Sequence, residues 1–140
     1  MNSIEFKGVK TRIITSKDRL ADILEEYLKK SPMKDGDILA ISSKVVALTE
    51  GRKKKVKNEY EFQKYLHDEA DCIIGNNGVV LALKNGIFAP WAGIDRSNVR
   101  EGEIILWPKD PFRSAKNILE KLNQAKVGTV PSQKSLKPPR

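Results

Sequence analysis

The residues best suited to chemistry in this sequence begin with Ser42-Ser43-Lys44, at the C-terminal end of the apolar run 37–42. Hydroxyl groups, backbone N–H groups and a lysine at a strand-to-helix turn suit a phosphate, because the donors converge and the helix N-terminus is positive. No glycine-rich run precedes Lys44, so this is not a Walker loop. On spacing alone a simpler interpretation is favoured, in which the serines cap a helix and Lys44 is a solvated charge.

A second group of polar residues follows Gly93 and comprises Asp95, Ser97 and Asn98. Carboxylate, hydroxyl and amide oxygens are donors that suit magnesium or manganese. One carboxylate is too few to hold such an ion, so the phosphates of a nucleotide or a second acid would have to complete the site. An equally simple interpretation, that Asp95 caps a turn, stays open.

The positive charge of the chain is concentrated in two places. Lys and Arg number 26 against 18 Asp and Glu, which gives a net charge of +8. Five of the cations lie between Arg52 and Lys57, and three more lie between Lys134 and Arg140. The first cluster could steer anionic substrates or nucleic acid, but a solvated surface loop is the commonest fate of such a run. Interleaved aromatic residues are missing from it, which makes a nucleic-acid partner unlikely.

The single cysteine, Cys72, excludes an internal disulfide and any multi-cysteine metal site. It lies in the apolar sequence ADCII, which predicts a buried, unreactive thiol. His67 is also the only residue of its kind, and histidine–cysteine catalysis stays open although neither residue lies in a recognised motif. The charged N-terminus lacks the apolar region of a signal peptide, and the nearly uncharged stretch 72–83 is too short to span a bilayer. These features predict a cytoplasmic protein without membrane contact.

The elements that position these residues can be predicted from periodicity. Residues 4–14 alternate between apolar and polar types and favour a strand. Ser16 is the expected N-cap of a helix over 17–30, whose apolar positions form one stripe. The run 37–42 reads as a buried strand, and a short helix is expected over 45–48.

The second half of the chain continues with mixed elements. A helix is expected over 59–72, with Glu69 on its less clean apolar stripe. Strands at 79–83 and 87–89 flank Lys84-Asn85-Gly86, a strong hairpin signal. Another strand is expected over 103–107 and a helix from Asp110-Pro111 onward. The order indicates a single α/β or α+β domain over residues 1–130, in which helices flank a mixed, partly antiparallel sheet. Residues 131–140 are predicted to form a disordered basic tail.

Several segments, taken together and in order, resemble the coenzyme F420:L-glutamate ligase (F420-0 gamma-glutamyl ligase) family. The first comprises Ile41 to Val46 followed by Glu50-Gly51-Arg52, and the second runs from Gly86-Ile87-Phe88 into Ala92 to Val99. The resemblance continues through Glu101-Gly102-Glu103, Leu106 to Pro111 and Ser114-Ala115, and Thr11-Arg12 also fits. It covers roughly residues 4–125.

The resemblance implies a specific reaction. GTP and a divalent cation, Mg²⁺ or Mn²⁺, would activate the carboxylate of a deazaflavin coenzyme precursor as an acyl phosphate, which the amine of L-glutamate attacks. Asp95 would ligate the metal. The resemblance also implies a set of nucleotide-binding residues, namely Val9, Lys10, Thr11, Arg12, Ser43, Lys44 and Asn98.

The sequence also departs from the family pattern. A second lysine usually precedes the Glu-Gly-Arg triplet, whereas Leu48 stands in that place. Trp91 replaces an asparagine close to Asp95. The acidic segment that supplies further metal ligands in the family is not found, and a homodimer or a second polypeptide could supply the missing part of the site. The alternative function is a non-catalytic module that binds nucleotide or, through its basic residues, nucleic acid.

Overall fold

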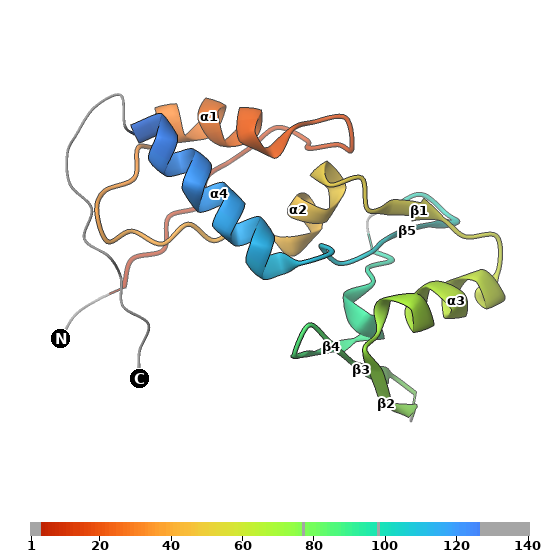
Figure 1. Ribbon diagram of the computed structural model, residues 1–140. Coiled ribbons are helices and arrows are strands. Elements are labelled where there is room, and N and C mark those ends of the chain that lie inside the picture. The colour runs from red at the N-terminus through yellow and green to blue at the C-terminus, as the bar shows by residue number, and fades with distance from the viewer. Residues whose placement is uncertain (1–3, 77, 98, 127–140) are drawn as a thin grey trace, which may run out of the picture.

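Helices and short strands alternate along the chain in a computed structural model that describes residues 4–76, 78–97 and 99–126 (Figure 1). The helices lie in two groups. Helices α1, α2 and α4 occupy one side of the molecule, and α3 lies with the strands on the other. The helices are α1 (Leu20–Lys30), α2 (Ser43–Thr49), α3 (Glu59–Glu69) and α4 (Pro111–Lys126), with a short helical turn η1 (Trp91–Gly93). The strands are β1 (Lys53–Lys55), β2 (Cys72–Asn76), β3 (Val80–Lys84), β4 (Ile87–Pro90) and β5 (Glu103–Ile105).

Two antiparallel sheets are formed by these strands. Strand β1 pairs with β5, with Lys54 opposite Ile104. The second sheet has the order β2-β3-β4. Its β3–β4 hairpin turns at Asn85 and Gly86, which adopt φ angles of 51° and 75°, as the Asn-Gly signal predicts. The predicted single α/β domain, in which helices accompany antiparallel strands, is therefore confirmed.

The hydrophobic core lies where α3 packs against the strands and η1. Phe62 and Leu66 of α3 are each 1% exposed. They belong to one cluster with the inward residues of β3 and with residues from η1 to the position after β5, namely Val80, Ala82, Ala92, Ile94, Ile104 and Leu106. This packing carries the loop after η1 directly over β5, where Asp95 forms an isolated bridge to Ile105.

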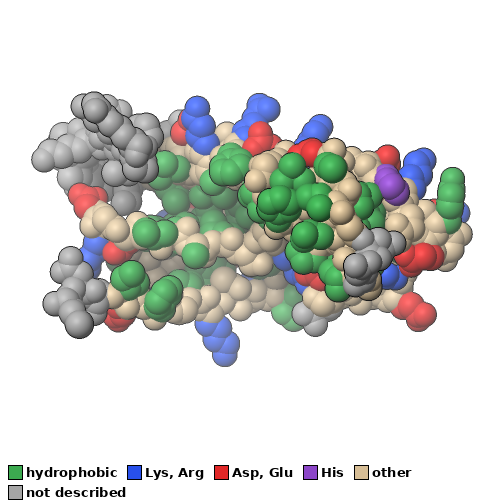
Figure 2. Space-filling model, turned by 90° about the horizontal axis from the view of Figure 1, so that it is seen from below, with side chains coloured by type: hydrophobic (Ala, Val, Ile, Leu, Met, Phe, Trp, Pro, Cys, Tyr) green, Lys and Arg blue, Asp and Glu red, His purple; other side chains and the backbone are tan. Residues whose placement is uncertain are grey.

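The N-terminal half differs from the strand predictions. The run 37–42 is not a buried strand, because it forms no strand and its Ile38 is 92% exposed. Residues 4–14 likewise form no strand in the part of the chain that is described, and Phe6 is 92% exposed. Both runs have strand-like composition, but a strand also needs a hydrogen-bonding partner, and no described strand pairs with either of them. Hydrophobic side chains also gather on the molecular face seen from below in Figure 2.

Element ends also differ from the predictions in places. The helix predicted over 59–72 ends at Glu69, and Cys72 begins β2 as an exposed residue, not a buried one. The basic run from Arg52 to Lys57 is not simply a surface loop, since its centre forms β1. Ser16 does not cap α1, which begins at Leu20 after a turn closed by the Asp18 carboxylate.

Two further features of the described part of the chain bear on earlier predictions. Asp110 does open α4, because its carboxylate accepts a hydrogen bond from the backbone N–H of Arg113 at 2.9 Å. No helix within residues 4–76, 78–97 and 99–126 is long and apolar enough to cross a membrane. The proposed tail, residues 131–140, lies outside the described residues.

Candidate functional site

Lys44 and Asp95, which the resemblance assigns to nucleotide and metal, form a direct ion pair. Lys44 Nζ lies 2.6 Å from Asp95 Oδ2. The same ammonium donates to the backbone carbonyl of Ser97 at 2.7 Å and lies 3.1 Å from its hydroxyl oxygen. Asp95 Oδ1 in turn accepts a hydrogen bond from the backbone N–H of Ser97 at 2.6 Å. Two of the sequence motifs therefore meet at one cluster.

Backbone structure positions both partners. Helix α2 begins at Ser43, so Lys44 projects from its first turn, where the free N–H groups of a helix lie. The Asp95 backbone exchanges two hydrogen bonds with that of Ile105, at 2.8 and 2.9 Å, and this fixes the loop against β5. A small depression opens between these elements and is lined by Ser43, Lys44, Gly93, Asp95, Ile105, Leu106 and Trp107.

The loop enters the site through a left-handed turn. Trp91, Ala92 and Gly93 have φ angles of 54°, 51° and 75°. Such a conformation costs roughly 1–2 kcal/mol for each residue with a side chain. The ring of Trp91 packs against Phe62, with 5.7 Å between ring centroids, so the indole is anchored in the core. Backbone strain of this kind is concentrated at functional sites, where the surrounding structure holds a segment in an unfavourable conformation.

Electrostatics keep Asp95 ionised. Burial acts to raise the pKa of its carboxyl group, but the hydrogen bonds from Lys44 and Ser97 outweigh that effect and leave the pKa below its usual value. The interpretation of Asp95 as a turn cap is confirmed by its bond to the Ser97 N–H. The simpler interpretation of Lys44 as a solvated charge is wrong, because its side chain is 24% exposed and paired. Ser42 precedes α2 without a side-chain capping bond.

The donors around Asp95 fit a divalent cation only in part. They are all oxygens, from one carboxylate, the hydroxyl groups of Ser43 and Ser97, and the Ser97 carbonyl. Oxygen donors are what Mg²⁺ and Mn²⁺ prefer, and Mg²⁺ commonly binds through one or two carboxylates together with substrate phosphates. Among residues 4–76, 78–97 and 99–126, no three acidic, histidine or cysteine side chains group into a metal site. Asp95 could therefore hold such an ion only together with phosphates or further ligands.

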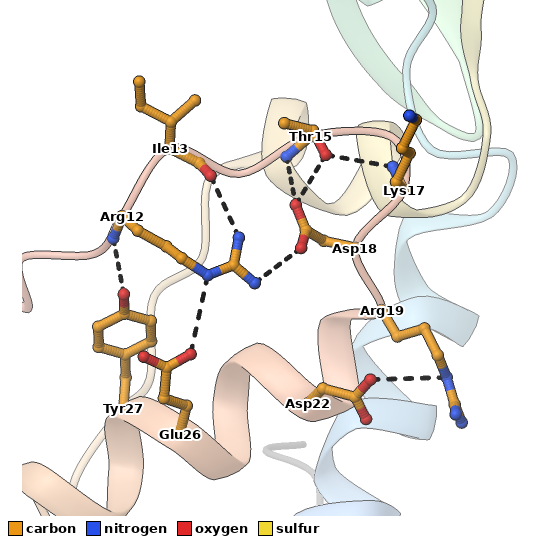
Figure 3. A network of polar contacts seen from close by, with 9 residues as sticks. All are labelled: Arg12, Ile13, Thr15, Lys17, Asp18, Arg19, Asp22, Glu26 and Tyr27. Atoms are coloured by element: carbon orange, nitrogen blue, oxygen red, sulfur yellow. Dashed lines mark hydrogen bonds and ion pairs between the residues drawn. The ribbon is translucent and has the colours of Figure 1, made fainter.

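The second predicted nucleotide-binding segment, residues 9–12, lies beside α1 (Figure 3). The backbone N–H of Arg12 donates to the Tyr27 hydroxyl at 2.7 Å, and its guanidinium lies 2.7 Å from the Asp18 carboxylate. Val9, Lys10 and Thr11 are exposed. Within the described residues, no hydrogen bond or ion pair joins this segment to Lys44 or Asp95. The remaining predicted residue, Asn98, lies outside the described residues.

The Arg12–Asp18 pair predicts a pH-dependent contribution to stability. The hydrogen bond from Arg12, followed by those from the Thr15 backbone and hydroxyl, lowers the pKa of Asp18 well below its usual value. A lowered folded-state pKa stabilises the protein above the unfolded pKa of about 4, and this stabilisation is lost as the pH falls through the folded pKa. Asp18→Asn should therefore destabilise the protein at pH 7, and the gap to the wild type should narrow below about pH 4.

Urea unfolding at pH 7 and pH 3 measures this effect. Asp22→Asn is the matched control, because Asp22 is an exposed carboxylate whose nearest cation, Arg19, lies 3.9 Å away. A gap between Asp18→Asn and the wild type that stays constant with pH would show that the Asp18 charge contributes nothing.

Sequence reasoning missed a buried cluster of charges next to the site. Glu69 Oε2 lies 2.6 Å from the Arg52 guanidinium and also pairs with Lys84, which is 5% exposed. Arg52 Nε donates to the Trp107 carbonyl at 3.0 Å. Two signals could have located the cluster, namely a carboxylate on the apolar stripe of 59–72 and a lysine at an inward position of the 80–84 strand. Arg52 thus connects α3 to Trp107, which lines the depression at Asp95.

Comparison with known proteins gives a consistent match. The family described as F420-0:Gamma-glutamyl ligase matches residues 8–130. A coenzyme F420:L-glutamate ligase of Methanopyrus kandleri is 29% identical, over 74% of this chain and 48% of the relative. One of Methanococcus maripaludis is 30% identical, over 76% and 51%. One of Archaeoglobus fulgidus is 29% identical, over 84% and 54%. The chain thus spans about half the length of the curated relatives it matches. With 123 of its residues matched in colinear order, this chain belongs to the F420-0:Gamma-glutamyl ligase family.

Proposed function

We propose that this chain takes part in the ligation of L-glutamate to a deazaflavin coenzyme precursor, in a reaction that depends on GTP and on Mg²⁺ or Mn²⁺. The observation that carries the proposal is the meeting of Lys44 and Asp95 at the start of α2. The names of the relatives supply the glutamate and the coenzyme, because they are coenzyme F420:L-glutamate ligases. GTP and the metal come from the resemblance in sequence.

The chemistry follows from the charges at the cluster. A nucleotide phosphate at the N-terminus of α2 would take Lys44 as its counter-charge and the first-turn N–H groups as donors. Lys44 would then leave Asp95, whose ionised carboxylate becomes free to hold the cation that accompanies the phosphates. A metal held by Asp95 would supply polarisation of the γ-phosphoryl group, which would pass from GTP to the precursor carboxylate with release of GDP. The glutamate amine would then attack the acyl phosphate, lose a proton and displace inorganic phosphate.

Calorimetric titration with GTP and with ATP, each with and without manganese, tests the proposal. We expect metal-dependent binding that weakens by about tenfold or more in Asp95→Asn and in Lys44→Ala, because each loses a charge-assisted contact. Lys64→Ala and Asp68→Asn are the matched controls, since both side chains are exposed on α3. No binding of either nucleotide, or equal binding by all four variants, would contradict a nucleotide site at this cluster.

A partner polypeptide is part of the proposal. Asp95 is the only carboxylate that contacts the cluster within the described residues, and one carboxylate is too few to hold a divalent cation without phosphates or further protein ligands. A second copy or a separate chain would then supply further metal ligands. Light scattering during size-exclusion chromatography tests for the second copy, and a chain that is monomeric while it ligates glutamate would contradict the need for one.

The rival function, nucleic-acid binding by the basic run, is less well supported. Arg52 pairs with Glu69, and Lys53 lies 2.6 Å from Glu103, so two of the five cations are already neutralised. The dependence of binding affinity on salt concentration distinguishes the two functions. Association through phosphate backbone contacts should collapse as salt rises, whereas nucleotide held by a metal should lose less affinity.

A further inference from the structure

A groove between α1, α2 and α4 is lined by charged side chains that belong neither to the hydrophobic core nor to the Lys44 cluster. It has a cavity volume of about 280 Å³. Figure 1 shows these three helices on the same side of the molecule. Its apolar wall is formed by Leu24, Val46 and Ile118, one from each helix. Concave sites with apolar walls and a few polar groups are typical of small-molecule sites, and this volume is near the lower end of their size range.

Two cations and one carboxylate line the groove. Arg19 and Lys121 are the cations, and Glu50 is the carboxylate. Arg19 has only a distant partner, Asp22 at 3.9 Å, and Lys121 has no ion pair within the described part of the chain. Glu50 Oε1 accepts a hydrogen bond from the Ser114 hydroxyl at 2.5 Å. That bond orients the Glu50 carboxylate and leaves Oε2 without a hydrogen-bond partner among the described residues.

The set of charges matches one kind of small molecule. A free dicarboxylic α-amino acid carries two carboxylates and one ammonium group, which is the complement of two cations and one carboxylate. Charge-assisted hydrogen bonds are the stronger ones, so this match would give selectivity over ligands that lack one of the three charges. Asn117 adds an amide to the same wall.

The groove and the Lys44 cluster lie at opposite ends of one helix. Lys44 stands in the first turn of α2, and Glu50 directly follows its last residue. Six residues of helix span about 9 Å along the axis. We propose that the groove between α1, α2 and α4 binds the acidic amino acid, with Arg19 and Lys121 contacting its carboxylates and Glu50 its ammonium group. This assignment rests on the proposed ligase function for the identity of the amino acid.

Titration of the 140-residue protein with L-glutamate, in the absence of nucleotide, tests the assignment. We expect saturable binding that weakens by about tenfold in Lys121→Ala and in Glu50→Gln, because each removes one charged contact. Lys116→Ala is the matched control, since Lys116 is an exposed lysine of α4 that does not line the groove, and it should bind like the wild type.

Titration with glutarate distinguishes the role of Glu50 from that of the two cations. It has both carboxylates of glutamate but no ammonium group, so it should bind the wild type more weakly than glutamate does. Glu50→Gln should not weaken glutarate binding further, whereas Lys121→Ala should. Absence of glutamate binding to the folded wild type, or equal losses for glutamate and glutarate in Glu50→Gln, would overturn the assignment.

Repeating the titration in Asp95→Asn distinguishes this assignment from the proposed nucleotide site. Glutamate affinity that is unchanged by Asp95→Asn, with the losses described above in Lys121→Ala, supports the groove whatever happens to nucleotide binding. Glutamate affinity that falls with Asp95→Asn and is insensitive to Lys121→Ala would place the amino acid at the Lys44 cluster and overturn the groove.

Discussion

Replacement of Gly93 by alanine should lower the free energy of unfolding by roughly 3 kcal/mol, the sum of a backbone cost and an overpacking cost. Gly93 has a φ of +75°, which side chains disfavour. A Cβ atom built on Gly93 would also lie 2.4 Å from the Trp107 ring atom Cε3. Relief of that contact requires the indole to move, and Trp107 lines the depression beside Asp95. Urea unfolding measures the loss of stability.

Gly86→Ala is a control matched to the backbone conformation. Gly86 also has a φ of +75°, but a Cβ atom there would meet nothing within 4 Å. It should therefore cost about 1 kcal/mol, from the backbone alone. The difference between the two variants isolates the contact with Trp107. Equal losses for Gly93→Ala and Gly86→Ala would mean that the indole moves away without cost.

The features that could be predicted from the sequence are the local ones. The β3–β4 hairpin follows from Asn85-Gly86, because these residues accept the positive φ angles of the turn. Helices α1 and α4 follow from apolar stripes with the period of a helix. In each case the residues that determine the structure lie within a few positions of one another.

The features that could not be predicted depend on strand pairing between segments that lie far apart in the sequence. Strand β1 exists because Lys53 to Lys55 pair with β5, about fifty residues later, and three consecutive lysines carry no strand signal of their own. Conversely, the run 37–42 has strand composition without a described partner strand. Composition indicates that a segment tolerates the extended conformation, whereas the partner decides whether a strand forms.

The candidate site likewise combines residues that the sequence singles out with long-range contacts that it does not predict. Residue types singled out Lys44 and Asp95, and the family resemblance grouped them as parts of one site. Neither observation predicted that they would contact each other through an ion pair, with Ser97 as the third member. Likewise, the sequence places Glu69 on an apolar helical stripe, but its pairing with Arg52 and Lys84 was not predicted, because these partners lie 17 and 15 residues away outside that helix.

The charge cluster of Glu69, Arg52 and Lys84 should have the second large effect on stability. Glu69→Gln keeps the shape of the side chain but removes the carboxylate that Arg52 and Lys84 share. Removal of one partner from a buried ion pair commonly costs 3–5 kcal/mol, because the remaining charge stays in the interior without compensation. We expect about 3 kcal/mol, since Glu69 and Arg52 retain 11% and 18% side-chain exposure.

The exposed carboxylate next to Glu69 on α3 provides the control. Asp68→Asn removes the same charge from the same helix at the surface and should change stability by less than about 0.5 kcal/mol. A double variant, Glu69→Gln with Lys84→Met, tests the cause. If the cost of Glu69→Gln arises from the uncompensated Lys84 ammonium, the double variant should be more stable than the single one, because the buried charge has been removed. A double variant that is less stable by the full sum of both changes would show that Lys84 contributes through its own packing, with the shared carboxylate of minor importance.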